Sequence, residues 1–194
     1  MHSRRLSCLL LGAWLGCSLF MGAVAILSFH SARNLLEEAP PQMRLLTQRV
    51  GGEEAMTHVL RYEVAEQNRQ LFEIWELFQI VMGLFLLGFL LFGTAEGKMP
   101  LALCLAMVVV VIAMHWLVTP HIVGLGRELD FQSVDSSPLI RSQLQARHAV
   151  YSALELVKLL FGTVLGALLV WPPTRKRQDR KLREVDEMKP YAVH

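Results

Sequence analysis

The sequence is poor in charge and in the residue patterns that carry most enzyme chemistry. Charged residues make up 19% of its 194 positions, against 53% for hydrophobic residues, a balance too apolar for an ordinary soluble domain. It contains no Gly-x-Ser-x-Gly, no Glu-x-x-His and no glycine loop for phosphate. Three cysteines have neither the spacing of a metal site nor a disulfide pattern: Cys8, Cys17 and Cys104. Nucleophilic catalysis and a locally encoded metal site are therefore without support.

The chain does contain four long apolar segments, which we interpret as membrane-spanning helices. A helix needs about 20 apolar residues to cross the hydrocarbon core of a bilayer. Residues 6–29 are uncharged throughout, and this run exceeds the ~7–15 residues of a signal-peptide core. We therefore expect a retained span rather than a cleaved signal. The other spans are expected at residues 74–94, at 101–118, where Pro120 ends the helix, and within the last helix, 138–171.

Two of these helices are too long for the membrane alone. Residues 53–92 contain no helix breaker and predict a helix of about 60 Å at 1.5 Å per residue, twice the ~30 Å of hydrocarbon. We therefore expect residues 53–72 to stand outside the membrane as a helical stem. The last helix, which begins at Pro138, is expected to have a stem too. A short helix is expected over residues 42–50 and a loop over 124–135.

Lysine and arginine flank the membrane segments unevenly, and this predicts the orientation. Arg4 and Arg5 precede the first segment, and residues 175–194 are rich in both residue types. Positive residues in short flanks stay in the cytoplasm, so both ends are expected there, which requires an even number of spans. Because these basic residues flank membrane segments, we interpret them as signals for orientation and expect no nucleic-acid partner.

The predicted fold class is an all-α membrane protein with a four-span helical bundle. Two hairpins form it, and spans two and four extend as helical stems outside the membrane. Residues 1–174 make up this transmembrane domain, and residues 175–194 are expected to be a basic, disordered cytoplasmic tail. We expect the protein in a bacterial cytoplasmic (inner) membrane.

Ionisable residues gather at one level of this bundle, in the half nearest the stems. Glu155 and Lys158 interrupt the last apolar run, where a charged group costs roughly 2.5–3.5 kcal/mol and normally faces a partner or a wet cavity. Spacings of three and four residues place polar groups and glycines of spans two and four on inward-facing stripes. The candidate binding cluster is Glu76, Gln79, Glu155 and Lys158, with His115 and His148 at its rim.

The two stripes also align with each other as a candidate internal repeat. Residues 76–83 (ELFQIVMG) match residues 155–162 (ELVKLLFG) with the same Glu, Leu and Gly, which predicts a direct repeat of two helical hairpins. A structural interpretation stays open beside the functional one. In it, Glu155 and Lys158 form a buried ion pair, and the histidines are satisfied core or helix-end groups.

Two short stretches carry a family resemblance. Residues 119–125 (TPHIVGL) and 147–152 (RHAVYS), the latter leading into Glu155 and Gly162, resemble the bacterial domain-of-unknown-function 4149 family. Its eukaryotic relatives are called transmembrane-protein-205-like. The resemblance covers residues 6–171, and the family is distantly similar to the CopD copper-resistance and HemJ haem-pathway groups, which place histidines in small helical membrane bundles. Haem or copper is thus implied by analogy only, and the chain lacks Met-rich copper motifs.

We expect a non-enzymatic binding or partner module, in which the polar cluster holds a small ligand, a proton or a cofactor. One alternative is a haem- or copper-associated oxidoreductase or metal-handling protein, as the analogy implies. Another is a small transporter or channel, which would need oligomerisation because four spans are few. The expected partners are the lipid bilayer and either a second copy of the chain or another membrane protein.

Overall fold

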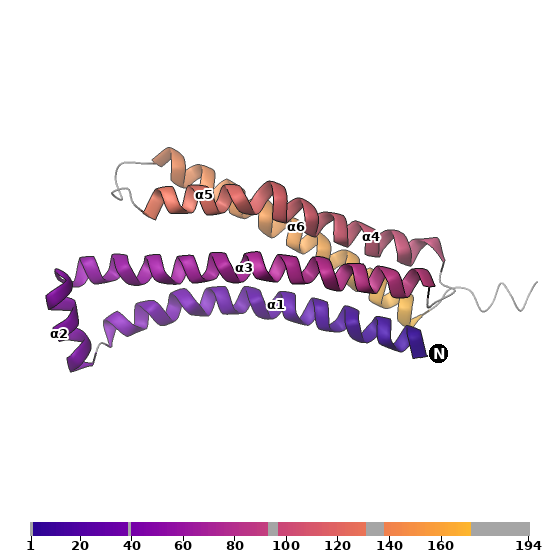
Figure 1. Ribbon diagram of the computed structural model, residues 1–194, viewed down its shortest axis with the longest axis horizontal. Coiled ribbons are helices and arrows are strands. Elements are labelled where there is room, and N and C mark those ends of the chain that lie inside the picture. The colour runs from indigo at the N-terminus through magenta and orange to yellow at the C-terminus, as the bar shows by residue number, and fades with distance from the viewer. Residues whose placement is uncertain (1, 39, 93–96, 131–137, 172–194) are drawn as a thin grey trace, which may run out of the picture.

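The computed structural model describes residues 2–38, 40–92, 97–130 and 138–171, and these are almost entirely helical (Figure 1). Four of the helices, Arg4–Leu35, Glu53–Phe92, Lys98–Asp130 and Pro138–Val170, are long and apolar enough to cross a membrane, as the sequence predicts. In chain order the elements are α1 (His2–Glu37), α2 (Pro41–Val50), α3 (Glu53–Phe92), α4 (Lys98–Ala113), the π-helical turn η1 (Met114–Val118), α5 (Thr119–Asp130) and α6 (Pro138–Val170).

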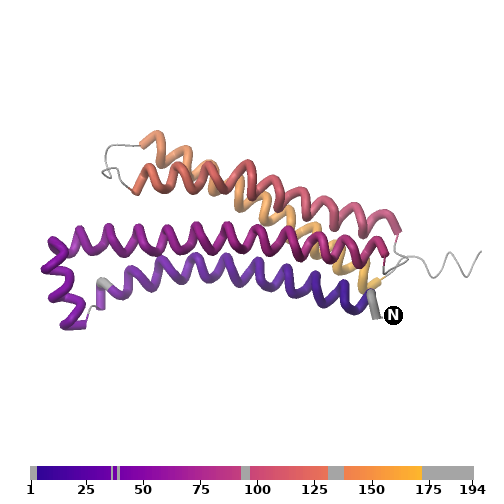
Figure 2. Tube along the Cα trace, in the orientation of Figure 1, coloured from indigo at the N-terminus to yellow at the C-terminus, as the bar shows by residue number. Residues whose placement is uncertain are grey.

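The long helices run up and down in one bundle with two distinct ends (Figures 1 and 2). The N-terminal end holds the start of α1, the end of α3, the start of α4 and the end of α6. The opposite end, called the α2 end below, holds α2, the last turn of α5 and the first turn of α6. α1 and α3 lie side by side along their length, whereas α6 begins beside α5 and ends beside α1. α6 therefore crosses the bundle obliquely, from α5 at the α2 end to α1 at the N-terminal end.

Two predictions about α2 and α3 are confirmed. α3 is a single helix of 40 residues, because no proline or loop-forming sequence interrupts it. α2 ends at Gly51, whose φ of +114° lies in the left-handed region that favours glycine. Parts of other predictions, the end of the loop over 124–135 and the tail 175–194, lie outside the described residues.

The third long helix corrects the prediction that Pro120 ends it. α4, η1 and α5 form one continuous helix, Lys98–Asp130. A proline ring clashes with the carbonyl four residues earlier in a regular α-helix. Here the preceding turn is π-helical, and the Thr119 N–H bonds to the Met114 carbonyl five residues back, so the widened turn accommodates the proline. Residues 124–130 are consequently helical, and the third helix is as long as the last, with 33 residues each.

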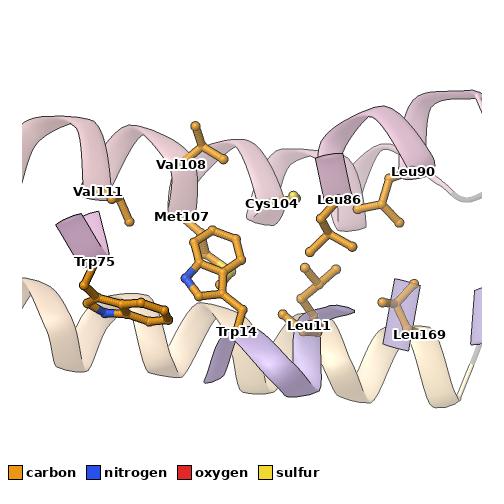
Figure 3. Packing of buried hydrophobic residues seen from close by; sticks show 11 residues of the cluster. Leu11, Trp14, Trp75, Leu86, Leu90, Cys104, Met107, Val108, Val111 and Leu169 are labelled. Atoms are coloured by element: carbon orange, nitrogen blue, oxygen red, sulfur yellow. The ribbon is translucent and has the colours of Figure 1, made fainter. Parts of the chain in front are cut away.

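The apolar core lies towards the N-terminal end, where all four long helices meet (Figure 3). Gly83 on α3 allows the closest approach: a Cβ atom there would lie 2.6 Å from Val108 and 2.8 Å from Trp14. Gly162 on α6 has the same relation to α1, since its Cβ would lie 2.5 Å from Leu15. Small residues that let helices touch are a common means of packing in membranes, where lipid is as apolar as the protein. The fully buried side chains of this core include Trp14, Leu86, Cys104, Met107, Val111 and Leu165.

Candidate functional site

The polar side chains that the sequence singles out lie immediately beyond this core, towards the α2 end. Lys158 of α6 is fully buried, with 0% of the residue exposed. Its Nζ donates hydrogen bonds to Ser18 Oγ of α1 at 3.2 Å and to Gln79 Oε1 of α3. Both carboxylate oxygens of Glu155, one turn earlier on α6, lie 2.7 Å from Nζ. Lys158 thus joins three helices through one ammonium group.

Gln79 completes this group, which we call the lysine cluster (Trp14, Ser18, Gln79, Glu155 and Lys158). The indole Nε1 of Trp14 donates to the same Gln79 Oε1 at 2.9 Å, so that oxygen accepts from two buried donors. An unpaired charge in the membrane is expensive, and a buried cation is tolerated when polar neighbours surround it. The cluster meets that requirement with one anion and two neutral oxygens.

A second group, the glutamate cluster (Glu76, His115, Thr119 and Tyr151), lies nearby. Glu76 of α3 is 0% exposed and accepts a hydrogen bond from Thr119 Oγ1 at 2.6 Å. Its other oxygen lies 3.0 Å from His115 Nδ1, and Tyr151 of α6 lies close to Glu76. His115 belongs to the π-helical turn and Thr119 follows it directly. The turn that accommodates Pro120 therefore also supplies both partners of Glu76 from the third long helix.

A cavity of about 750 Å³ opens from these clusters towards the α2 end. The polar lining residues nearest the two clusters are Glu155, Ser18 and Thr119, and the part of the cavity that they line is called its deep end. Side chains of α1, α3, α5 and α6 form its walls. Asn68 of α3 also lines it, and this residue is 7% exposed with no hydrogen-bond partner for its Nδ2. A buried unpaired amide donor is costly. The apolar wall residues include Met21, Phe29, Phe72, Trp75, Ile122 and Leu156.

Ion pairs between α3 and α5 border this cavity at the α2 end. Arg69 donates to Asp130 at 2.6 Å and to Glu66 at 3.0 Å, and Arg127 donates to Glu66 at 2.5 Å. Glu66 lies in the polar part of α3, outside the apolar segment 74–94. Its hydrogen bonds with Arg127 and Arg69 lower the pKa of its carboxyl to about 2. The network holds α3 against α5 at the level where α6 and α1 separate.

The structure brings the predicted residues together as two clusters rather than one. Glu155, Lys158 and Gln79 belong to the lysine cluster, whereas Glu76 and His115 belong to the glutamate cluster. The remaining predicted residue, His148, is separate from both: it lines the cavity from α6 and is exposed. Residues that the sequence did not single out are Trp14, Ser18, Asn68, Thr119, and the ion pairs of Glu66, Arg69, Arg127 and Asp130.

The candidate repeat has a geometric counterpart. Phe72 and Tyr151 form an edge-on ring contact with centroids 5.9 Å apart, and Gln79 bonds to Lys158. Gly83 and Gly162 are both buried at close helix contacts. Each of these pairs is separated by the same offset in the sequence, so the matched positions of α3 and α6 lie at the same depth. The repeat itself stays a prediction.

Neither the geometry of possible metal ligands nor comparison with known proteins assigns a function to the chain. Within the described residues, no three His, Cys, Asp or Glu side chains come together as ligands of a metal ion. Comparison of the chain with family models, with curated proteins and with solved structures gave no match. The resemblance to the domain-of-unknown-function 4149 family therefore stays a prediction.

Proposed function

We propose that the protein is a non-enzymatic binding module of a bacterial cytoplasmic membrane, which holds a small amphiphilic molecule in the cavity between α1, α3, α5 and α6. Both termini lie in the cytoplasm in this proposal, so the α2 end faces outwards. Four helices of sufficient length and apolarity support the membrane location, and the basic flanks at both ends support the orientation.

The cavity is the single observation that carries the proposal. Its volume of about 750 Å³ falls within the roughly 300–1,000 Å³ of typical small-molecule sites. Such sites combine apolar walls with a few fixed polar groups. Here the walls are largely apolar, and the polar groups of Glu155, Ser18 and Thr119 at the deep end are held by buried hydrogen bonds.

The two clusters have different roles in this proposal. The lysine cluster fixes α1, α3 and α6 to one another and presents Glu155 at the deep end of the cavity. The glutamate cluster fixes the π-helical turn, which directs Thr119 towards the same space. Both keep their charged groups partnered, so the deep end stays polar while the walls exclude water. A ligand then binds to a site that is formed in advance.

Filling the cavity tests the proposal. We expect full-length protein, purified and stripped of lipid, to bind oleoyl lysophosphatidate or monooleoyl glycerol saturably in a native mass-spectrometry titration. Ala25→Phe places a ring in the cavity and should weaken that binding at least about tenfold. Ala23→Phe is the matched control, because Ala23 is exposed on the same helix and does not line the cavity.

A second pair of variants covers the case in which Ala25→Phe fails to fold. Ser152→Phe enters the cavity from α6, whereas Ala153→Phe points away from it. Circular dichroism checks that each variant is folded. Equal binding in the cavity variants and their controls, or no saturable binding of either lipid by the wild type, would overturn the proposal.

A further inference from the structure

Two of the helices that line the cavity, α1 and α6, lie apart along part of their length. These helices touch near the N-terminal end, where Ser18 bonds to Lys158 and Leu15 contacts Gly162. Towards the α2 end they separate (Figure 1). The cavity-lining residues on the two edges of this gap are exposed, Ile26 of α1 at 73% and Leu156 of α6 at 67%. In a bilayer an opening with such apolar edges meets lipid chains rather than water.

The charges that line the cavity leave one cation uncompensated. Four charged residues line it, namely Arg61, Arg69, Asp130 and Glu155. Arg69 is paired with Asp130, and Glu155 with Lys158. Arg61 has no ion pair among the residues that the structure describes, and it is exposed. The cavity therefore favours an anionic group at the end where Arg61 lies.

The lining residues of α3 form a stripe that changes from cationic to amide to aromatic. Arg61, Asn68, Phe72 and Trp75 follow one another at helical spacings on the cavity side. The rise from Arg61 to Asn68 is about 10 Å at 1.5 Å per residue. Asn68 offers an unpartnered Nδ2 donor within this stripe, and such a donor needs an acceptor such as an ester carbonyl.

We infer that the ligand is a bilayer lipid with an anionic head group, which enters sideways between α1 and α6. Its phosphate binds to Arg61, its ester carbonyl accepts from Asn68 Nδ2, and its acyl chain packs against Phe72 and Trp75 and leaves between α1 and α6 without filling the polar deep end. This inference rests on the proposed function and specifies its ligand. The order of the three contacts along α3 matches the order of phosphate, ester and chain along a phospholipid, and the apolar edges of the opening admit the chain.

Two lipids with the same oleoyl ester distinguish the phosphate contact of Arg61 from the ester contact of Asn68, because only one of the lipids has a phosphate. For the wild type we expect oleoyl lysophosphatidate to bind at least about tenfold more tightly than monooleoyl glycerol in the same titration. Arg61→Gln should remove this preference and Arg61→Lys should keep most of it. Asn68→Leu should weaken both lipids about fivefold, since both have the ester carbonyl.

Arg33→Gln is the matched control, because Arg33 is also exposed but does not line the cavity. It should leave the preference unchanged. Equal affinity for the two lipids in the wild type, or a preference that survives Arg61→Gln, would overturn the anionic-lipid inference while the binding function stands. Displacement of lysophosphatidate by millimolar inorganic phosphate would also overturn it, because the site would then recognise a free anion. If Ala25→Phe bound both lipids as tightly as Ala23→Phe, the proposed binding function itself would be overturned.

Discussion

The two halves of this bundle are built from the same four helices and differ in almost every other respect. The half at the N-terminal end is apolar and closely packed, with Gly83 and Gly162 at the helix contacts. The half at the α2 end is spread around a cavity of about 750 Å³ and contains buried charges at its base. Close packing in one half therefore provides a rigid base from which the other half can stay open.

Side-chain size explains where the change occurs. Gly83 brings α3 close to α1 and α4, and Gly162 brings α6 close to α1 and α4, whereas α3 and α6 meet in the open half through long side chains, as in the ring contact of Phe72 with Tyr151. Between these levels Lys158 and Gln79 bridge the remaining gap with a hydrogen bond. The lysine cluster is therefore the boundary between the packed half and the open half.

The largest effect is expected from Lys158→Met. Removing one partner of a buried ion pair costs roughly 3–5 kcal/mol, because the other charge is left without compensation. Glu155 is 22% exposed, so we expect a loss near the lower end, about 3 kcal/mol, in the free energy of unfolding. Titration of detergent-solubilised protein with sodium dodecyl sulfate, followed by tryptophan fluorescence, measures it.

A double variant that removes both charges of the ion pair is the control for that experiment. Combining Lys158→Met with Glu155→Gln removes both charges, and neutral replacements of buried pairs are often tolerated. The double variant should therefore be more stable than Lys158→Met alone. If both variants were as stable as the wild type, the lysine cluster would not join the two halves.

A smaller effect is expected from Gly83→Ala in the packed half. The new Cβ would lie 2.6 Å from Val108 Cγ2 and 2.8 Å from the Trp14 ring, and neither side chain has a flexible end that can move away. Overpacking of this kind costs about 1–3 kcal/mol. Gly88→Ala is the control, since no atom lies within 4 Å of its Cβ position. A fully stable Gly83→Ala variant would show that the packed half is looser than described.

The smallest effect concerns the ion pairs of Glu66 in the open half. The pKa of Glu66 is lowered from 4.5 to about 2 by Arg127 and Arg69, so its contribution to stability is fully present above pH 4.5. This contribution is lost as the pH falls towards about 2. Glu66→Gln should therefore lower stability at neutral pH by no more than about 1 kcal/mol, and the difference from wild type should disappear at low pH.

Thermal unfolding of both proteins between pH 7 and pH 2 measures this difference. Glu63→Gln is the control, because Glu63 is exposed and accepts a hydrogen bond only from Gln67, on its own helix, among the described contacts. A difference between wild type and Glu66→Gln that stayed constant down to pH 2 would show that the α3–α5 ion pairs do not stabilise the open half.

Charged residues were the part of the site that the sequence could reveal. Glu155 and Lys158 stand out because they interrupt an apolar run, and Glu76 and Gln79 because they occupy the matching stripe of another helix. Three further residues make hydrogen bonds within the two clusters, namely Trp14, Ser18 and Thr119. They are ordinary residues of membrane helices and therefore give no such signal. Their partners lie 65, 140 and 43 positions away in the sequence, so only the packing of the helices identifies them.

Pro120 shows a second feature that the sequence could not predict. Proline normally ends a helix, and the prediction of a loop after it followed from that rule. A π-helical turn one step earlier removes the clash, and the sequence has no signal for such a turn. The same turn places His115 and Thr119 on Glu76, so the exception to the rule lies at the candidate site itself.

The pattern of amino acids is sufficient to predict the long apolar helices, most of their ends, and the level at which the ionisable groups lie. Those features follow from composition and local periodicity, which each segment contains alone. Contacts between helices are needed to show that the charges form two clusters, that α6 separates from α1, and that a cavity lies between Lys158 and the α2 end. These features depend on which side chains meet across helices, and the shape of that contact is not encoded in any single segment.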